Sequence, residues 1–155
     1  IVGDRFIFYV FIAGMILLHQ HAGAAQIKWQ TYPEALRTAA REKKPLFFHV
    51  RSNWCYYCKK MDQRTFSRPR VIDLLNRNFI PVKISESTDY KLMKKFKVKG
   101  YPDNRFYDHN EVLIFQFYGF QPAEVFMVFL EFVDSGSYKT MDVMTFYEKR
   151  RQKKN

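Results

Sequence analysis

The sequence predicts an α/β fold in which helices flank a central mixed β-sheet of roughly four to five strands. The first half of the chain alternates short apolar runs with helix-forming stretches, which is typical of parallel strands joined by helical crossovers. The second half contains two strand-like runs separated by a short polar turn, which indicates an antiparallel hairpin. A chain of 155 residues with 47% hydrophobic and 18% aromatic content can bury a substantial core, so we expect one compact domain.

The N-terminal segment 1–25 has the features of a signal peptide. Arg5 precedes an apolar run over residues 6–18, and the small residues ending at Ala25 resemble a cleavage site. The run is short for a transmembrane helix, which needs about 20 apolar residues. The alternative is an uncleaved anchor that tethers the protein to a membrane. In both cases we expect an exported protein, periplasmic or secreted, in a compartment where disulfides persist.

Helix and strand alternate through the first half of the predicted domain. The expected elements are a helix over 33–43, a strand over 46–50, a helix over 55–64, a helical segment after residue 67 and a strand over 79–84. Thr31 and Glu34 fit a capping box for the first helix. Ser67 is expected to cap the later helical segment, with Pro69 in its first turn. Because Pro81 lacks an N–H, its strand is expected at a sheet edge or with a bulge.

The second half predicts a hairpin between helices. The expected elements are a helix over 89–96, strands over 105–107 and 112–118, a helix that starts at residue 122 and stops before residue 136, and a last helix over 140–150. Thr88 is expected to cap the first of these helices, and the polar stretch 108–111 suits a tight turn. We therefore expect a domain over residues 26–136, followed by a basic helical extension over residues 137–155.

The chain is strongly basic, with 26 Lys and Arg against 15 Asp and Glu and a net charge of +11. Such a surface attracts anionic partners, among them acidic proteins, lipid headgroups and nucleic acids. Export argues against nucleic acid, and the basic residues are scattered except at 91–99 and 149–154. We interpret most of this charge as the solvated face of a monomer.

The only two cysteines lie three positions apart in the stretch NWCYYCKKM, residues 53–61, soon after the predicted strand 46–50. If Cys55 occupies the first turn of the following helix, free N–H groups and the helix dipole stabilise its thiolate and lower its pKa. Cys58 then lies on the same face, within disulfide reach. One sulfur can attack a substrate disulfide while the other resolves the mixed disulfide, so the pair suits thiol-disulfide exchange.

Two other uses of the cysteine pair are less favoured. A structural zinc site needs four ligands, and beyond the signal segment only His49 and His109 could join the two thiolates. Neither histidine has the spacing of a paired ligand, so we expect no metal. A purely structural disulfide would close a very short loop and remove little entropy from the unfolded chain. We therefore expect a redox-active pair that needs no other cofactor.

The stretch HVRSNWCYYCKKM, followed later by VKGYP, resembles the thioredoxin superfamily. The segment DQRTFSRPRVIDLLNRNFIPVKI is similar to its exported thioredoxin-like branch, which includes the periplasmic domain of DsbD-type reductases. The resemblance covers roughly residues 27–134 and implies a thioredoxin fold. It also implies that Cys55 is an exposed nucleophile, that Cys58 is a buried resolving thiol, and that Tyr101-Pro102 is a cis-proline loop facing them.

Aromatic residues beside the two cysteines are candidates for substrate binding. Trp54, Tyr56 and Tyr57 would form an apolar rim for flexible protein substrates, unless they pack against the domain instead. A cis bond before Pro102 would present the backbone of Tyr101 to an extended peptide.

The sequence also departs from the family pattern. Six residues before the first cysteine the family often carries a buried acid, and this chain has His49. A buried imidazole can act as a base or, when charged, favour a thiolate, so His49 is expected to tune Cys58. The alternative is a hydrogen-bonded core histidine. Lys59 is a second expected tuning residue, and Asp103 occupies a position where thioredoxins usually have threonine, which bears on substrate specificity.

These observations predict an exported thiol-disulfide oxidoreductase that reduces or isomerises protein disulfides through the WCYYC motif. The Tyr-Tyr spacer lacks the histidine of strong oxidants, which favours this direction over disulfide formation. The alternatives are a disulfide-forming oxidant, or a thioredoxin-like binding or chaperone module with an idle disulfide. The expected partners are protein substrates and a redox partner, for instance a membrane electron donor.

Overall fold

The computed structural model describes residues 25–153. The predicted signal peptide therefore lies outside the described residues, apart from Ala25. Within the described part of the chain, no helix has the length and apolar character needed to cross a bilayer.

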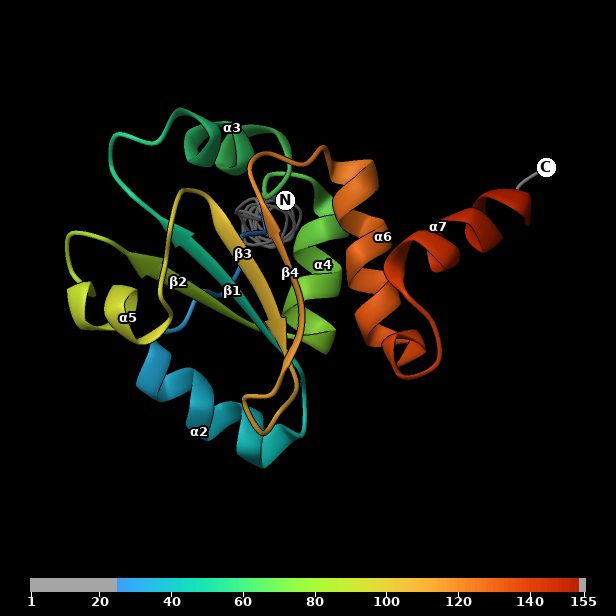
Figure 1. Ribbon diagram of the computed structural model, residues 1–155, viewed down its shortest axis with the longest axis horizontal. Helices are drawn as coiled ribbons and strands as arrows, with labels where there is room; N and C mark the ends of the chain where they lie inside the picture. Colours follow the sequence, from blue (N-terminus) through green and yellow to red (C-terminus); the bar gives the residue numbers. More distant parts are fainter. Residues whose placement is uncertain (1–24, 154–155) are drawn as a thin grey trace, which may run out of the picture.

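A four-stranded mixed sheet forms the centre of the fold, in the order β2-β1-β3-β4 (Figure 1). Its strands are β1 (Leu46–Arg51), β2 (Ile80–Ser85), β3 (Asp103–Tyr107) and β4 (Leu113–Tyr118). β1 pairs in parallel with β2 and antiparallel with β3, and β3 pairs antiparallel with β4. The predicted mixed sheet is confirmed. Pro81 lies in the edge strand β2, where its missing N–H is tolerated.

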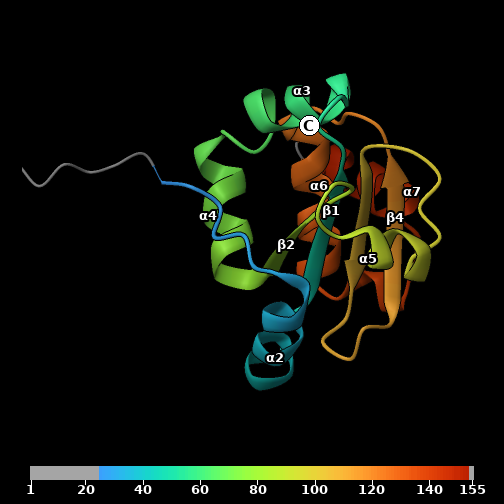
Figure 2. The same cartoon turned by 90° about the vertical axis from the view of Figure 1, so that its left-hand side faces the viewer.

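Helices cover both faces of the sheet. They are α2 (Tyr32–Glu42), α3 (Tyr56–Arg64), α4 (Pro69–Asn78), α5 (Tyr90–Lys95), α6 (Ala123–Asp134) and α7 (Val143–Gln152), with a 3-10 turn at Ser137–Lys139. α2 and α5 pack on one face, and α4 and α6 pack on the other (Figure 1). α3 follows β1 and lies beyond the end of the sheet (Figure 2).

Neighbouring side chains of β1 point to opposite faces and join two separate core clusters. Phe48 packs with α2 and α5, whereas Phe47 packs with α4 and α6. The ring centroid of Phe47 lies 4.9 Å from that of Phe106 and 5.1 Å from that of Phe126. Because both faces of β1 are covered, consecutive residues from Leu46 to Val50 are all buried.

The helix caps partly agree with the sequence. The capping box of Thr31 and Glu34 is present at the start of α2, so that prediction is confirmed. The predicted cap Ser67 is wrong, because Arg68 is the N-cap residue of α4. The hydroxyl of Ser67 instead donates to the carbonyl of Gln63 at 2.7 Å, on the last turn of α3. The Ser67 hydroxyl therefore bonds to the backbone of the preceding helix and does not cap α4.

Two later boundaries also differ from the prediction. Thr88 does not cap α5, because Asp89 is the N-cap residue and the Thr88 hydroxyl donates to its carboxylate at 2.7 Å. The last helix begins at Val143 rather than at residue 140. The 3-10 turn Ser137–Lys139 occupies the preceding segment. The Asp142 carboxylate caps α7 by accepting hydrogen bonds from the N–H groups of Met144 and Thr145.

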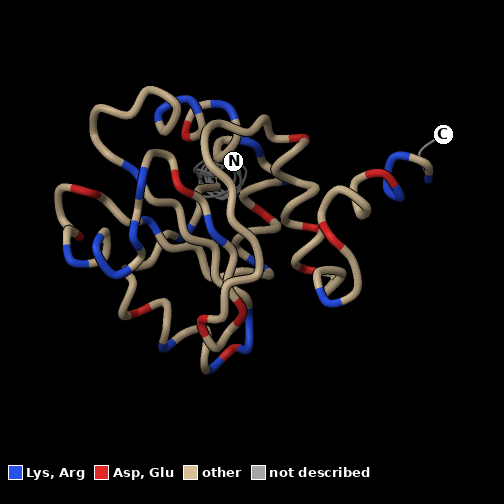
Figure 3. Tube along the Cα trace, viewed as in Figure 1, with Lys and Arg blue, Asp and Glu red and all other residues tan. Residues whose placement is uncertain are grey.

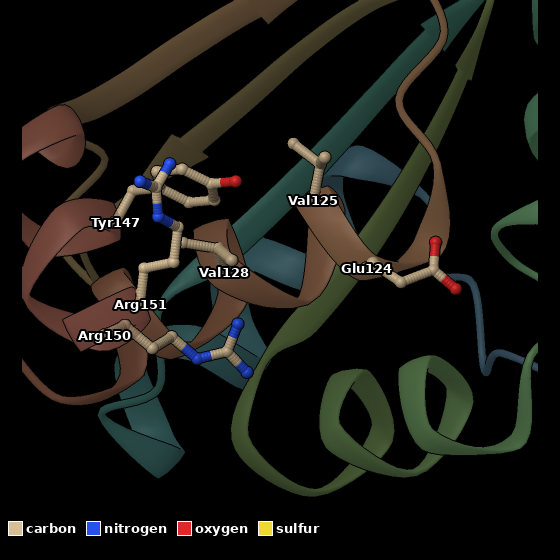
Figure 4. Close-up of a pocket in the computed structure, with 6 residues that line it drawn as sticks. All are labelled: Glu124, Val125, Val128, Tyr147, Arg150 and Arg151. Carbon is tan, nitrogen blue, oxygen red and sulfur yellow. The ribbon is translucent and has the colours of Figure 1, made fainter. Parts of the chain in front are cut away.

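The C-terminal helix α7 projects from the domain and carries several basic residues (Figures 1 and 3). Phe146 contacts Phe132 of α6, with ring centroids 5.5 Å apart, and Arg150 forms an ion pair with Glu131 at 2.6 Å. None of its residues is fully buried. A pocket of about 200 Å³ lies between parts of the two helices and is lined by Glu124, Val125, Val128, Tyr147, Arg150 and Arg151 (Figure 4).

Candidate redox site

Cys55 and Cys58 form a disulfide just beyond the end of β1. A short loop after Arg51 leads to Cys55, which is the N-cap residue of α3. The backbone N–H of Cys58 donates to Cys55 Sγ at 3.0 Å, and the two Cα atoms are 5.3 Å apart. The same N–H and the helix dipole would stabilise a thiolate on Cys55 in the reduced protein.

The two cysteines differ slightly in exposure. Cys58 is fully buried, as the resemblance implies, and Cys55 is 4% exposed. The expectation of an exposed Cys55 is therefore wrong for the disulfide form. Its sulfur is bonded to Cys58 and lies against the first turn of α3, which leaves only a small part of the residue open to solvent.

The loop before β3 lies beside the cysteine loop. The Tyr101-Pro102 peptide bond is cis, as the resemblance implies. The ring of Tyr101 meets the indole of Trp54 edge to face, with centroids 5.7 Å apart. The carbonyl of Pro102 accepts a hydrogen bond from the N–H of Gly119 at 3.0 Å, which ties the loop to the end of β4. Two segments far apart in the sequence therefore meet at Trp54, the residue before Cys55.

A third loop, after β2, contributes Glu86. Its carboxylate accepts a hydrogen bond from the indole N–H of Trp54 at 3.2 Å. Burial and the negative charge of Glu86 raise the pKa of the Tyr101 phenol above its ordinary value. The backbone N–H of Glu86 donates to the carbonyl of Arg51 at 2.9 Å, next to the cysteine loop. Glu86 was not among the predicted site residues, although it follows a strand expected to lie parallel to the one before the cysteines.

His49 lies in β1 and is fully buried. Its Nδ1 is 2.7 Å from the side-chain oxygen of Asn104 in β3. Because that oxygen only accepts, Nδ1 carries the hydrogen and Nε2 is left as the basic nitrogen. Nε2 has no hydrogen-bond partner among the described residues. Burial lowers the pKa of His49 to about 4, so the imidazole is neutral at neutral pH.

Charged side chains surround this histidine. Asp62 lies one turn after Cys58 on α3, and its carboxylate is 3.3 Å from the Lys83 ammonium and 3.9 Å from the Arg51 guanidinium. The charge of Asp62 raises the pKa of His49, whereas the charges of Lys83 and Arg51 lower it. The spacing of Asp62 from Cys58 could have identified it from the sequence. The contact of Asn104 with His49 could not be foreseen, because it depends on the register of β1 and β3.

A family model described as a thioredoxin-like domain matches residues 32–134. The chain belongs to the thioredoxin-like domain family. The thiol:disulfide interchange protein DsbD of Campylobacter jejuni is 35% identical over 71 residues, which is 44% of this chain and 12% of that protein. The disulfide bond reductase DsbH of Chlamydia pneumoniae is 26% identical over 98 residues, which is 55% of this chain and 58% of that protein. The matched part thus spans less than two thirds of either relative.

A solved structure agrees with this assignment to the thioredoxin-like family. The solution structure of a thioredoxin from Thermus thermophilus has a TM-score of 0.62 and 26% sequence identity. The similarity covers 70% of this chain and 87% of that chain. The thioredoxin fold predicted from the sequence is confirmed.

The cysteine loop of this thioredoxin-like domain carries exposed aromatic side chains. Trp54 is 73% exposed, Tyr56 is 69% exposed and Tyr57 is 52% exposed. The rings of Tyr56 and Tyr57 touch each other, with centroids 5.3 Å apart. Trp54 also packs against the domain, through Tyr101, whereas Tyr56 and Tyr57 contact each other. The role of the three side chains in substrate binding stays a prediction.

Two other predicted residues of the thioredoxin-like domain differ in their surroundings. Lys59 is exposed on α3, and its tuning role stays a prediction. Asp103 is fully buried and pairs with the guanidinium of Arg105 at 2.6 Å. It also accepts a hydrogen bond from the side chain of Gln116 at 2.9 Å. Asp103 thus joins β3 to β4 and is closed to solvent.

Proposed function

We propose that the protein is an exported thiol-disulfide oxidoreductase that reduces or isomerises protein disulfides through Cys55 and Cys58. The observation that carries the proposal is the disulfide at the N-terminus of α3, beside the Tyr101-Pro102 loop. The names of the DsbD and DsbH relatives, thiol:disulfide interchange protein and disulfide bond reductase, support the same chemistry. The signal-like segment 1–25 supports export.

The first step starts from the reduced pair. The Cys55 thiolate attacks one sulfur of the substrate disulfide, so that a bond forms between Cys55 and that sulfur. The substrate disulfide breaks, and its other sulfur leaves as a thiolate that takes up a proton. The N–H of Cys58, which donates to Cys55 Sγ at 3.0 Å, lowers the energy of the attacking thiolate.

The second step releases the substrate. The Cys58 thiolate attacks Cys55 Sγ, the Cys55–Cys58 disulfide forms, and the remaining substrate sulfur leaves as a thiol. The substrate has gained two electrons and two protons, and the protein has lost them. A redox partner with a dithiol must then return them, and we propose a membrane electron donor for this role. Isomerisation follows when the released substrate thiol attacks another disulfide of the same chain.

Trapping tests the proposal directly. A Cys58→Ser variant lacks the resolving sulfur, so substrates should accumulate as mixed disulfides on Cys55. These complexes should disappear on reduction and should not form with a Cys55→Ser, Cys58→Ser double variant. If wild-type protein exchanges no disulfide and the single variant captures no partner, the pair is idle and the protein is a binding module.

The reduction potential distinguishes the direction of electron flow. A thioredoxin-like reductant should have a potential near about −270 mV, and a strong oxidant near about −120 mV. Equilibration of the protein with glutathione or dithiothreitol mixtures gives this value. We expect a potential close to the first figure, and a value near the second would favour the oxidant instead.

A further inference from the structure

Four basic side chains lie along α3 and the start of α4, on the helix that begins at the cysteine pair. They are Lys60, Arg64, Arg68 and Arg70, and we call them the α3 ridge. The three arginines are exposed and Lys60 is partly exposed. Figure 3 shows basic positions gathered along α3. Within residues 25–153, none of the four forms an ion pair.

Helical spacing and a hydrogen bond bring the side chains of the α3 ridge together. Lys60 and Arg64 are four positions apart on α3, so they lie on the same face of the helix. The Nε of Arg68 donates to the carbonyl of Arg64 at 3.3 Å, which keeps Arg68 beside that face. The Lys60 ammonium lies 4.5 Å from the centre of the Phe120 ring. The ridge does not form a run in the sequence, because its members are spread over residues 60–70.

The charge of the α3 ridge is not neutralised by the acid within the same stretch. The Asp62 carboxylate is already paired with Lys83 at 3.3 Å and with Arg51 at 3.9 Å. The first turn of α4 contains Arg70 and no acid. A positive charge at that end of a helix is unfavourable, so Arg70 does not stabilise α4 through the helix dipole. The positive charge of the ridge is therefore available to a partner.

We propose that the α3 ridge binds acidic segments of protein substrates, so that the redox site prefers disulfides whose flanking chain carries aspartate or glutamate. The inference rests on the proposed function, since it names the substrate class of the same redox site. A substrate bonded to Cys55 already has its chain at the N-terminus of α3, and Lys60 and Arg64 follow on that helix. The flanking chain of a substrate can thus reach the ridge.

The length of α3 sets where the acidic residues should be. Arg64 follows Cys55 by nine residues, a distance of about 13 Å along a helix. An extended polypeptide covers this distance with about four residues. Tyr56 and Tyr57 are exposed and precede Lys60 by one helical turn, so one open surface connects the cysteine loop with the ridge. We expect acids about four to six residues from the substrate cysteine.

Three disulfide-linked peptides and one small disulfide test this preference. The peptides carry aspartate, serine or lysine about four to six residues from each cysteine, and hydroxyethyl disulfide is the small substrate. The wild-type kcat/KM should be about tenfold higher for the aspartate peptide than for the serine peptide, and lowest for the lysine peptide. Raising the salt from about 20 mM to about 300 mM should remove most of this difference, because salt screens exposed charges.

Charge reversal shows whether the α3 ridge causes the preference. The double variant Arg64→Glu, Arg68→Glu should lower kcat/KM for the aspartate peptide about tenfold and raise it for the lysine peptide. The variant Arg64→Gln, Arg68→Gln should have an intermediate effect. The matched control is Lys149→Glu, Arg151→Glu, which changes the net charge as much as the ridge reversal does, at exposed positions of α7. Rates with hydroxyethyl disulfide should be the same in all these proteins, which also shows that the variants fold.

Equal kcat/KM for the aspartate and serine peptides, or equal losses in the ridge and control variants, would overturn the inference. Sedimentation with phosphatidylglycerol vesicles tests a lipid surface as the partner instead. Vesicle binding that the ridge reversal abolishes, without any peptide preference, would assign the ridge to lipid and also overturn the inference. Failure of the wild-type protein to reduce hydroxyethyl disulfide would refute the proposed oxidoreductase function itself.

Discussion

His49 is a fully buried base beside the redox helix, with one ring nitrogen bound to Asn104 and the other without a partner among the described residues. A purely structural core histidine would have hydrogen bonds at both ring nitrogens, and within the described part of the chain His49 has one at Nδ1 alone. The negative charge of Asp62, one turn after Cys58, raises the pKa of the same imidazole and partly offsets the effect of burial. We propose that His49 tunes the Cys58 thiol. An unchanged Cys58 pKa in a His49→Gln variant would refute this.

Protonation of His49 should also set the pH dependence of stability. Because its folded pKa, about 4, lies below its unfolded pKa of 6.5, the unfolded chain binds more protons between these values. Stability should therefore fall as the pH drops from 6.5 to 4. In His49→Gln this fall should be smaller by about 2–3 kcal/mol, measured by urea unfolding across the range. Equal pH profiles for the two proteins would contradict the shifted pKa.

Some site residues could be identified from local sequence motifs, and others could be identified only from the folded structure. Cys55 and Cys58 were identified because their spacing on a helix is itself a chemical pattern. Pro102 was identified from the resemblance, and its preceding bond is cis. Glu86 and Asn104 have no local signature, because each matters only through a side chain brought close by the sheet.

At the scale of elements, α6 packs on the same face of the sheet as α4. Phe126 is fully buried and lies 5.1 Å from Phe47 and 5.6 Å from Phe66 between ring centroids. Such a contact set depends on the helical spacing of apolar residues along α6, which was visible in the sequence.

Truncation of that side chain should be costly. Phe126→Ala should lower the free energy of unfolding by about 3–5 kcal/mol, because it leaves a cavity among several rings. Val125→Ala, on the partly exposed side of the same helix, should cost about 1 kcal/mol or less. Denaturant unfolding of both variants checks the difference. Similar losses at the two positions would show that this aromatic cluster contributes no more than the helix surface does.

Helix boundaries were predicted less well than helices. Ser67 and Thr88 both have the chemistry of a cap, yet each donates its hydroxyl to another acceptor. Capping chemistry is present in many short polar residues, and the one that is used depends on where the preceding chain arrives. Existence of a helix depends on apolar periodicity over a whole segment, which is a stronger signal.

At the scale of the molecule, the family match ends at residue 134 and α7 follows it. Basic residues lie on α3, α5 and α7, with acids between them, so the charge is spread over the surface (Figure 3). α7 contacts the domain through Val143, Phe146 and Arg150, and none of its residues is fully buried.

The domain should therefore fold without α7. A chain that ends at Met141 should unfold cooperatively, with a loss of about 1–2 kcal/mol from the exposure of Phe132 and its neighbours. Its rate with hydroxyethyl disulfide should stay within about twofold of the full chain. Thermal unfolding and the exchange assay measure both quantities. An unfolded truncated chain would mean that α7 belongs to the core domain.

The sequence by itself determined the order of helices and strands and the chemistry of the cysteine pair, and it restricted the strand with Pro81 to a sheet edge or a bulge. Each of these depends on neighbouring residues, whose periodicity and spacing can be read within one segment. Only the tertiary structure decided that Cys55 is nearly closed to solvent, that His49 meets Asn104, and that Trp54 is held by Glu86 and Tyr101. Those contacts join residues far apart in the chain, so they depend on sheet register and loop path.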